Sequence, residues 1–94
     1  YEEALADLDR VVNLDPGSYF NWAVRGQVKN LMGNNKDALE DLNQADKLQP
    51  NDAFTLSTRG NVKFLLGLYD EAIADLEKSL SIQPTNAWAT KVLE

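Results

Sequence analysis

The sequence predicts an all-α protein built from a repeated pair of helices, and three observations lead to this prediction. Identical residues recur at one constant spacing of 34 positions in this chain of 94 residues. Each repeated stretch holds two segments with the apolar spacing of a helix. The prolines Pro16, Pro50 and Pro84 are also 34 residues apart and mark a recurring junction. Identity at a fixed period, with other residues between, indicates a repeated structural unit.

The period is carried by pairs of identical residues. These pairs are Arg25/Arg59, Gly26/Gly60, Val28/Val62, Lys29/Lys63, Gly33/Gly67, Ala38/Ala72, Asp41/Asp75, Leu42/Leu76, Gln49/Gln83 and Pro50/Pro84. The period also continues outward, since Ala4 lies 34 positions before Ala38. At the other end, Ala87 lies 34 positions after Ala53. We therefore expect two complete units between two partial ones, and we expect the chain to be an excerpt of a longer protein or a processed product.

The predicted helices alternate between two kinds, a first (A) and a second (B) helix of each unit. Residues 2–14 form a B helix without its A helix. In the next unit, an A helix near residues 18–32 leads through a turn at Gly33-Asn34-Asn35 to a B helix near residues 36–48. Residues 87–94 are expected to begin a further A helix. The order along the chain is thus B-A-B-A-B-A.

The second complete unit shows the helix signals in full. Asn51-Asp52 can cap an A helix over residues 53–66, and Gly67 can supply the left-handed residue that ends it. The A helix is indicated by a spacing of three to four residues between Leu56, Gly60, Lys63, Phe64 and Gly67. One face of the B helix, which stops before Pro84, is traced by Tyr69, Ala72, Ile73, Leu76 and Leu80.

Glycine recurs inside both A helices, where it costs about 1 kcal/mol relative to alanine. Close approach of the facing B helix offsets this cost, because a residue without a side chain lets Leu42 or Leu76 pack against the backbone. Ala38 and Ala72 are small for the same reason. We therefore interpret Gly26, Gly60 and these alanines as packing residues without a catalytic role.

Together these residues resemble the tetratricopeptide repeat (TPR). The signature positions of that family match Trp22, Gly26, Ala38, Ala45, Pro50, Gly60, Tyr69, Ala72 and Pro84. The resemblance implies an α-solenoid of antiparallel helix pairs, wound as a right-handed superhelix, whose concave groove is lined by A helices and holds a peptide. It divides the chain into one array, with a partial repeat at residues 1–18, repeats at 19–52 and 53–86, and a further A helix from 87 to 94.

The chain departs from the family pattern at several positions. Arg25 and Arg59 stand where leucine is usual, and Lys29 and Lys63 where tyrosine is usual. Leu56 replaces the tryptophan, and Ser79 replaces an alanine. The A helices are consequently basic on the face that turns toward the B helices.

Two interpretations of these basic residues differ in function. They can form a basic groove for acidic peptides, or they can pair with Asp41 and Asp75 inside the repeat while their stems cover apolar surface. We favour the intramolecular pairing, because all four lie one turn from Gly26 or Gly60 on the side that packs against B helices.

Composition excludes several classes of function. The net charge of −6 disfavours binding to nucleic acid, so an RNA-binding helical repeat is the least favoured alternative. The chain has no cysteine and no histidine, which removes the usual nucleophile-base pairs and zinc ligands. The carboxylates Asp37, Glu40 and Asp41 share a helix face that we interpret as solvated. We expect no enzyme, cofactor, metal or membrane segment; the compartment stays open, with a soluble cytoplasmic protein as the default expectation.

The groove candidates follow from the family geometry. The groove side of the A helices carries Phe20, Ala23, Val24, Gln27, Asn30, Leu31, Phe54, Ser57, Thr58, Asn61, Phe64, Leu65, Trp88 and Lys91. Phe20, Phe54 and Trp88 are 34 residues apart and form an aromatic row. Such a row can anchor apolar side chains, while the amides hydrogen-bond a peptide backbone. Aromatic residues also fill gaps between neighbouring helices, and that alternative stays open for Phe54 and Phe64 and is favoured for Trp88.

Two known groove chemistries of the family are not expected. The clamp that binds the carboxy-terminal tails of heat-shock chaperones uses lysine, asparagine and arginine, and its positions hold Ala23, Gln27, Thr58, Trp88 and Val92. The asparagine ladder of glycan-transferring members has its positions taken by Val24, Thr58 and Val92. We therefore predict no carboxylate clamp for chaperone tails in this stretch.

The leading hypothesis is a protein-interaction scaffold that binds a peptide rich in apolar or aromatic residues. An alternative is a structural spacer or a self-associating segment of a longer solenoid, because a B helix without its A helix leaves Leu5, Leu8, Val11 and Val12 partly uncovered. A third possibility is the targeting arm of an enzyme whose catalytic domain lies outside this sequence.

Overall fold

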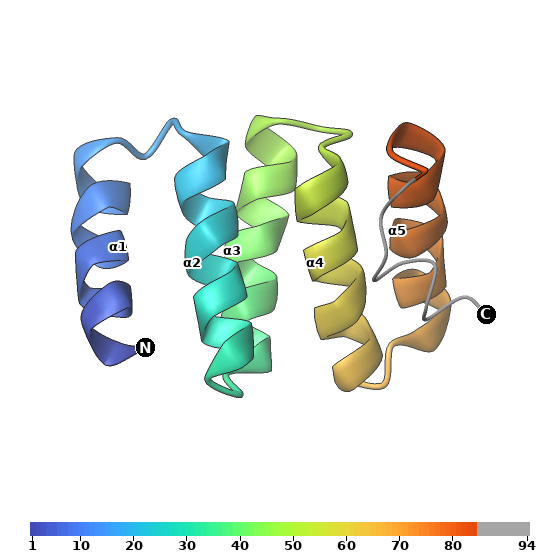
Figure 1. Cartoon of the computed structure of the whole chain (residues 1–94), viewed down its shortest axis with the longest axis horizontal. Coiled ribbons are helices and arrows are strands. Elements are labelled where there is room, and N and C mark those ends of the chain that lie inside the picture. The colour runs from blue at the N-terminus through green and yellow to red at the C-terminus, as the bar shows by residue number, and fades with distance from the viewer. Residues whose placement is uncertain (85–94) are drawn as a thin grey trace.

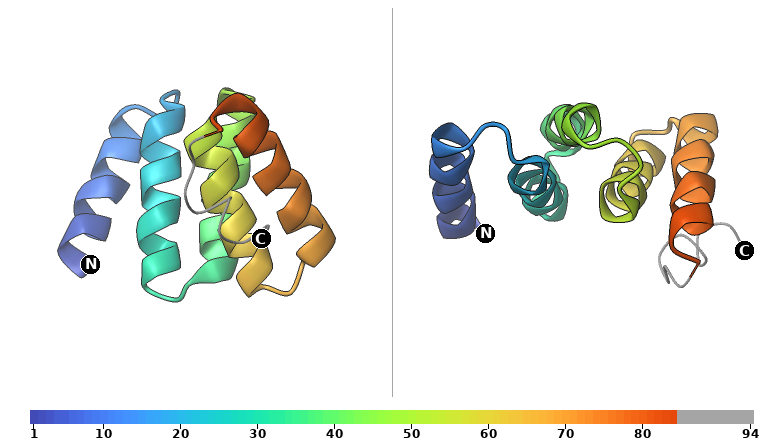
Figure 2. Two further views of the ribbon diagram at one scale, coloured as in Figure 1. Left: turned by 45° about the vertical axis from the view of Figure 1, so that its right-hand side comes forward. Right: turned by 90° about the horizontal axis from the view of Figure 1, so that it is seen from above.

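A computed structural model of the chain describes residues 1–84, which form a row of five α-helices (Figure 1). The helices are α1 (Glu2–Leu14), α2 (Tyr19–Leu31), α3 (Asn35–Leu48), α4 (Ala53–Leu65) and α5 (Tyr69–Ile82). Seen from above, α2 and α4 lie on one side of the row and α3 on the other (Figure 2). The A helices are thus α2 and α4, and the B helices are α1, α3 and α5. The all-α prediction is confirmed, since the described residues form helices and no strand.

The predicted helix bounds differ from the observed ones by one residue at most. The turn predicted at Gly33-Asn34-Asn35 is one residue too long, because Asn35 already belongs to α3. The A helix expected over residues 87–94 lies outside the described residues.

The turns follow from residues that tolerate a left-handed backbone. Gly33 and Gly67, which follow the two A helices, have φ angles of 86° and 82°. Asn51 has a φ of 67°, which asparagine adopts more readily than most residues. Asp52 then caps α4, because its carboxylate accepts a hydrogen bond of 2.9 Å from the Thr55 backbone N–H.

Each complete repeat has a close contact between its two helices at the glycine of the A helix. A Cβ added at Gly26 would lie 2.8 Å from the Cγ atom of Leu42, and one at Gly60 would lie 2.7 Å from that of Leu76. Both leucines are fully buried. The expected role of the helical glycines in close packing is confirmed.

The buried core continues along the facing surfaces of the helices. Its fully buried residues include Ala23, Ala38, Leu42, Ala45, Leu56, Val62, Ala72 and Leu76. Ser79, which replaces an alanine of the family pattern, is also buried and donates a 3.0 Å hydrogen bond to the Ala53 carbonyl oxygen. The hydroxyl therefore adds a hydrogen bond between α4 and α5, and its own polar group is satisfied.

Two expectations about apolar faces need correction. Val12 was expected to be partly uncovered, but it is buried, because α2 covers that side of α1. Tyr69 and Ile73 were placed on the packed face of the last B helix, yet they are 57% and 40% exposed. Ala72 and Leu76 occupy the centre of that face, so Tyr69 and Ile73 lie at its edge.

Candidate functional site

The basic residues of the A helices are bound within the repeats. Arg25 forms a bidentate salt bridge with Asp41, with distances of 2.9 Å from Nε to Oδ2 and 2.8 Å from Nη2 to Oδ1. Arg59 repeats this contact with Asp75 at 2.8 and 2.9 Å. The lysines one turn later complete each cluster, since the Nζ atom of Lys29 lies 3.0 Å from Asp41 and that of Lys63 lies 3.0 Å from Asp75. The predicted intramolecular pairing is confirmed.

This pairing corrects the interpretation of one acidic residue. Asp41 was grouped with Asp37 and Glu40 on a solvated face, but its side chain is only 5% exposed. Asp37 and Glu40 are exposed as expected. The guanidinium of Arg25 also lies over the Trp22 ring, with its carbon 5.0 Å from the ring centroid, which is the geometry of a cation–π contact.

The arginines also connect consecutive repeats. The Nη1 atom of Arg25 lies 3.1 Å from Oδ1 of Asp9 on α1. In the next repeat, Nη1 of Arg59 lies 3.2 Å from both Asn43 and Asp46 on α3. Each arginine therefore bridges the B helix before it and the B helix after it.

The charges of each cluster shift its pKa values. Burial alone would raise the pKa of Asp75, but hydrogen bonds and charges from Arg59 and Lys63 together lower it below its usual value of 3.8. For Arg25, the hydrogen bond to Asp41 is the main cause of a raised pKa. These groups therefore stay charged at neutral pH.

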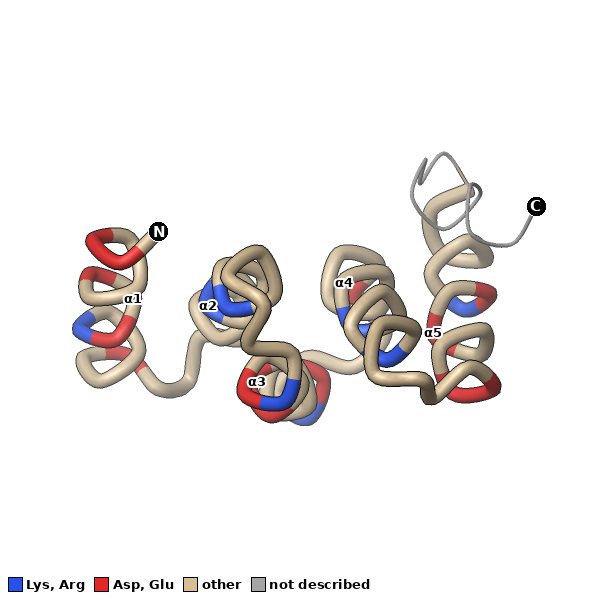
Figure 3. Tube along the Cα trace, turned by 90° about the horizontal axis from the view of Figure 1, so that it is seen from below, with Lys and Arg blue, Asp and Glu red and all other residues tan. Residues whose placement is uncertain are grey.

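The pairing leaves an uncharged surface between the A helices. Figure 3 shows acidic residues along α1, α3 and α5 and the basic residues of α2 and α4. A cavity of about 260 Å³ lies between α2 and α4. It is lined by Gln27, Asn30, Leu31, Phe54, Ser57, Thr58 and Asn61. All seven were named as groove residues from the sequence, and the fold brings them together.

Three amide side chains form a chain across this surface. Nδ2 of Asn61 donates to Oδ1 of Asn30 over 3.1 Å, and Nδ2 of Asn30 donates to Oδ1 of Asn35 over 2.9 Å. The bonds fix the side chain of Asn30 between α4 and the start of α3. Asn35 was not predicted as a groove residue, and no repeat signal points to it, because Tyr69 stands 34 positions later.

Aromatic and aliphatic residues lie at the two ends of the A helices. Near the amino-terminal end, the Phe20 and Phe54 rings are 6.2 Å apart, and Phe20 is 55% exposed. Phe54 also packs against the core, as the gap-filling alternative expects, and it lines the cavity between α2 and α4. Near the carboxy-terminal end, Leu31, Phe64 and Leu65 are exposed, and the Phe64 ring meets Tyr69 edge-on at 5.2 Å. Trp88 and Lys91 lie outside the described residues.

The positions that correspond to the family's carboxylate clamp and asparagine ladder differ in accessibility. Ala23 is buried, Val24 and Thr58 are half-buried, and Gln27 is exposed. Trp88 and Val92 lie outside the described part of the chain. Thr58 and Gln27 are therefore the described clamp positions whose side chains line the cavity.

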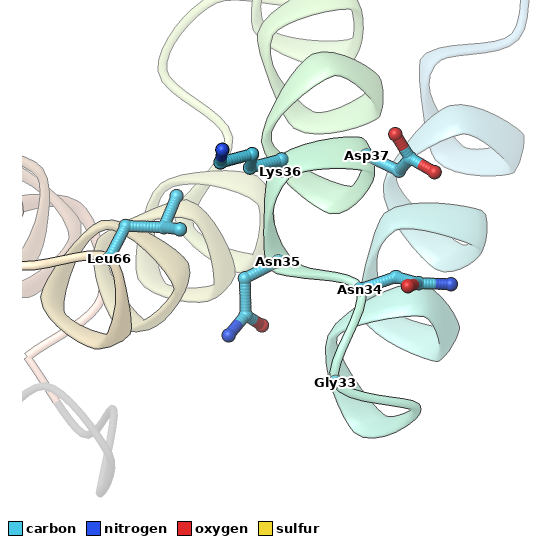
Figure 4. Close-up of a pocket in the computed structure, with 6 residues that line it drawn as sticks. All are labelled: Gly33, Asn34, Asn35, Lys36, Asp37 and Leu66. Atoms are coloured by element: carbon cyan, nitrogen blue, oxygen red, sulfur yellow. The ribbon is translucent and has the colours of Figure 1, made fainter.

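A second cavity, of about 340 Å³, lies at the turn between α2 and α3, and it is a weaker candidate. It is lined by Gly33, Asn34, Asn35, Lys36, Asp37 and Leu66. Figure 4 shows that Asn34 and Asp37 point away from Leu66, so the polar groups do not converge on one point. Such convergence is what a ligand site requires.

Within residues 1–84, no group of three or more acidic, histidine or cysteine side chains is placed to hold a metal ion. None of the described helices has the length and hydropathy needed to cross a membrane.

Comparison with family profiles gives two matches that together follow the repeat period. Profiles of the tetratricopeptide repeat match residues 21–52 and residues 53–86. A comparison with curated protein sequences finds no significant match.

Solved structures with closely similar folds carry the same kind of domain. The first TPR of Spaghetti (RPAP3), bound to the HSP90 peptide SRMEEVD, superposes with a TM-score of 0.94 at 28% identity, over 99% of this chain and 74% of that one. The second TPR domain of human RPAP3, in complex with the HSP70 peptide SGPTIEEVD, gives a TM-score of 0.90 at 27% identity, over 99% and 78%. The Arabidopsis OM64 TPR domain, at 20% identity and a TM-score of 0.93 over 98% and 76%, shares the fold.

Proposed function

The chain belongs to the tetratricopeptide repeat family, and on that premise we propose that it is a protein-interaction scaffold that binds a peptide segment between α2 and α4. The observation that carries this proposal is the cavity on that surface, where amide, hydroxyl and apolar side chains lie together. A peptide needs both hydrogen-bonding partners for its backbone and apolar contacts for its side chains.

Relatives of similar fold support a peptide as the partner. Both RPAP3 domains were solved with short peptides bound. An identity of 27–28% supports a peptide as the kind of partner, but it does not specify the sequence of that peptide.

The test is a peptide-display selection on the folded chain and on two charge variants. Leu31→Glu places a carboxylate on the cavity wall, at a residue that is 56% exposed and therefore tolerates the change. Leu14→Glu makes the same change on α1, at a residue that is 79% exposed and outside the cavity. Circular dichroism would first be used to check that both variants remain helical.

We expect the parent and Leu14→Glu to enrich the same consensus peptide and Leu31→Glu to lose it. Enrichment that Leu31→Glu retains in full would place binding elsewhere. No enrichment by any of the three chains would remove the support for a peptide-binding role.

A second candidate function, self-association, is favoured by the apolar residues exposed on α5. Leu68, the N-cap residue of α5, and Tyr69, Ile73 and Ile82 on the helix itself are each between 39% and 57% exposed. Exposed apolar residues that cluster on one helix are typical of surfaces that pack against another helix. Light scattering over a hundredfold range of concentration tests this alternative, and a mass that stays monomeric throughout would contradict it.

A further inference from the structure

We propose that the groove selects an extended, uncharged peptide with two apolar anchor side chains five residues apart, and that it rejects acidic peptides. This inference rests on the proposed peptide-binding function and adds the chemistry of the ligand to it. Three features of the described residues carry it: the neutralised cations, the apolar residues at both ends of the A helices and the amides between them.

The cations of the A helices are not available to a ligand. The side chains of Arg25, Lys29, Arg59 and Lys63 are only 11–17% exposed, and each lies within 4 Å of a carboxylate of its own repeat. An acidic peptide would have to displace Asp41 or Asp75, and it would leave that buried carboxylate without its partner. The seven residues that line the cavity carry no charge. A charged ligand would therefore lose its hydration without gaining a counter-charge.

The spacing of the two anchors follows from helix geometry. Phe20 is 55% exposed at one end of α2, and Leu31 is 56% exposed at the other. The eleven residue steps from Phe20 to Leu31 rise by about 16 Å at 1.5 Å per step. An extended peptide covers that distance in about five residues at roughly 3.3 Å each. On α4, Phe54 and Leu65 stand at the same two positions of the repeat, so the ends are matched across the groove.

The amides between the anchors suit the backbone of such a peptide. Gln27, Asn30 and Asn61 all line the cavity, and an amide side chain both donates and accepts hydrogen bonds, as a peptide unit does. The bonds from Asn61 to Asn30 and from Asn30 to Asn35 hold two of these amides in position before the ligand arrives. Groups that are held in place lose less conformational freedom on binding.

The experiment measures the dissociation constants of four peptides by fluorescence anisotropy. The first, Phe-Ser-Thr-Asn-Ser-Leu with blocked ends, has its two anchors five residues apart. The second has the same composition with phenylalanine and leucine two residues apart. In the third, both serines of the first peptide are replaced by glutamate. The fourth is SRMEEVD, the peptide bound by a domain of similar fold.

We expect the first peptide to bind at least about tenfold more tightly than each of the others, since losing a well-placed anchor typically costs a factor of about ten. Phe20→Ala and Leu31→Ala should each weaken the first peptide by about the same factor and leave the second unchanged. Leu14→Ala, outside the groove, should change neither.

The possible failures are distinguishable. Equal affinity for the first and second peptides, or binding of the third or fourth as tight as that of the first, overturns this inference and leaves the peptide-binding function in place. If the third or fourth peptide binds, its dissociation constant is measured again with the variant Lys91→Ala. Weaker binding to this variant would show that Lys91, which lies outside the described residues, supplies the positive charge that attracts the acidic peptide. If none of the four peptides binds and display also finds none, the proposed function and this inference fail together.

Discussion

At the scale of single residues, the packing of each repeat depends on a glycine without a side chain as much as on the leucine that faces it. Gly26 and Gly60 occupy points where the A and B helices approach closely, and the branch of Leu42 or Leu76 fills the space that a methyl group would need. The neighbouring carbonyl oxygens of Ala38 and Ala72 lie 3.2 Å from the added Cβ positions and belong to the backbone, so they cannot move aside.

The replacement Gly60→Ala should therefore destabilise the protein. Helix propensity favours alanine by about 1 kcal/mol, but overpacking against Leu76 and the Ala72 carbonyl costs about 1–3 kcal/mol. We expect a net loss of about 1 kcal/mol in the free energy of unfolding, measured by urea denaturation. Gly17→Ala is the control, since only Asp15 lies within 4 Å of the added Cβ, and it should be neutral or slightly stabilising. A more stable Gly60→Ala protein would contradict the close-packing role.

The buried carboxylate of each cluster gives a second prediction at this scale. Asp75→Asn removes the partner of Arg59 and Lys63, whose side chains are 13% and 11% exposed. We expect a loss of about 2–3 kcal/mol, below the usual cost of breaking a buried pair, because Arg59 retains Asp46. Glu71→Gln, which removes a 61% exposed carboxylate that lies 3.7 Å from Lys63, should cost less than about 0.5 kcal/mol. Similar losses for the two variants would show that the cluster contributes no more than surface charges do.

At the scale of helices, the clusters join each A helix to the B helices on both sides. Arg59 binds Asp75 on α5 and Asp46 on α3, and Arg25 binds Asp41 on α3 and Asp9 on α1. Leucine, the residue of the family pattern at the arginine positions, can pack against a neighbour but cannot connect two carboxylates. The same pairing keeps the groove side of α2 and α4 uncharged.

The pH dependence of the free energy of unfolding should test the contribution of the Asp75 carboxylate, which joins α5 to α4. The pKa of Asp75 is lowered in the folded state, so its folded form binds fewer protons than its unfolded form. Its contribution is thus complete above the unfolded pKa near 3.9 and is lost as the pH falls through the lower folded value. We expect the free energy of unfolding to decrease below about pH 4 and to decrease less steeply in Asp75→Asn. Parallel curves for the two proteins would rule out this carboxylate as a source of acid sensitivity.

At the scale of the whole molecule, the repeat period allowed most of the fold to be predicted and left parts of the site open. Identical residues at 34-residue spacing allowed the helices, the glycine contacts and the ion pairs to be predicted, because the same residues occur in both repeats. Asn35 and its place in the amide chain were missed, since this residue occurs in one copy and its partner Asn30 comes from the preceding helix. The burial of Asp41 was also not predicted from the charge pattern. The sequence does not distinguish a buried carboxylate from its exposed acidic neighbours when the position of the facing helix is unknown.

Stability should vary along the row of helices. Val12 is the one residue of α1 that is buried, whereas α4 buries Ala53, Thr55, Leu56, Ser57, Gly60 and Val62. Helices with few buried contacts open at low free energy. In hydrogen exchange followed by mass spectrometry, we therefore expect α1 to lose its amide protection first and the central helices α3 and α4 last. Equal protection of α1 and α3 would mean that the row unfolds as a single unit.

The most direct test of peptide binding between the A helices is an NMR titration of the uniformly ¹⁵N-labelled chain with a display-selected peptide. The side-chain amide signals of Gln27, Asn30 and Asn61 report on the cavity wall, and those of Asn13 and Gln44 report on the B helices α1 and α3. We predict that the three groove amides shift in proportion to bound peptide while Asn13 and Gln44 stay in place. Shifts confined to Asn13 and Gln44, with the groove amides unchanged, would contradict binding between α2 and α4.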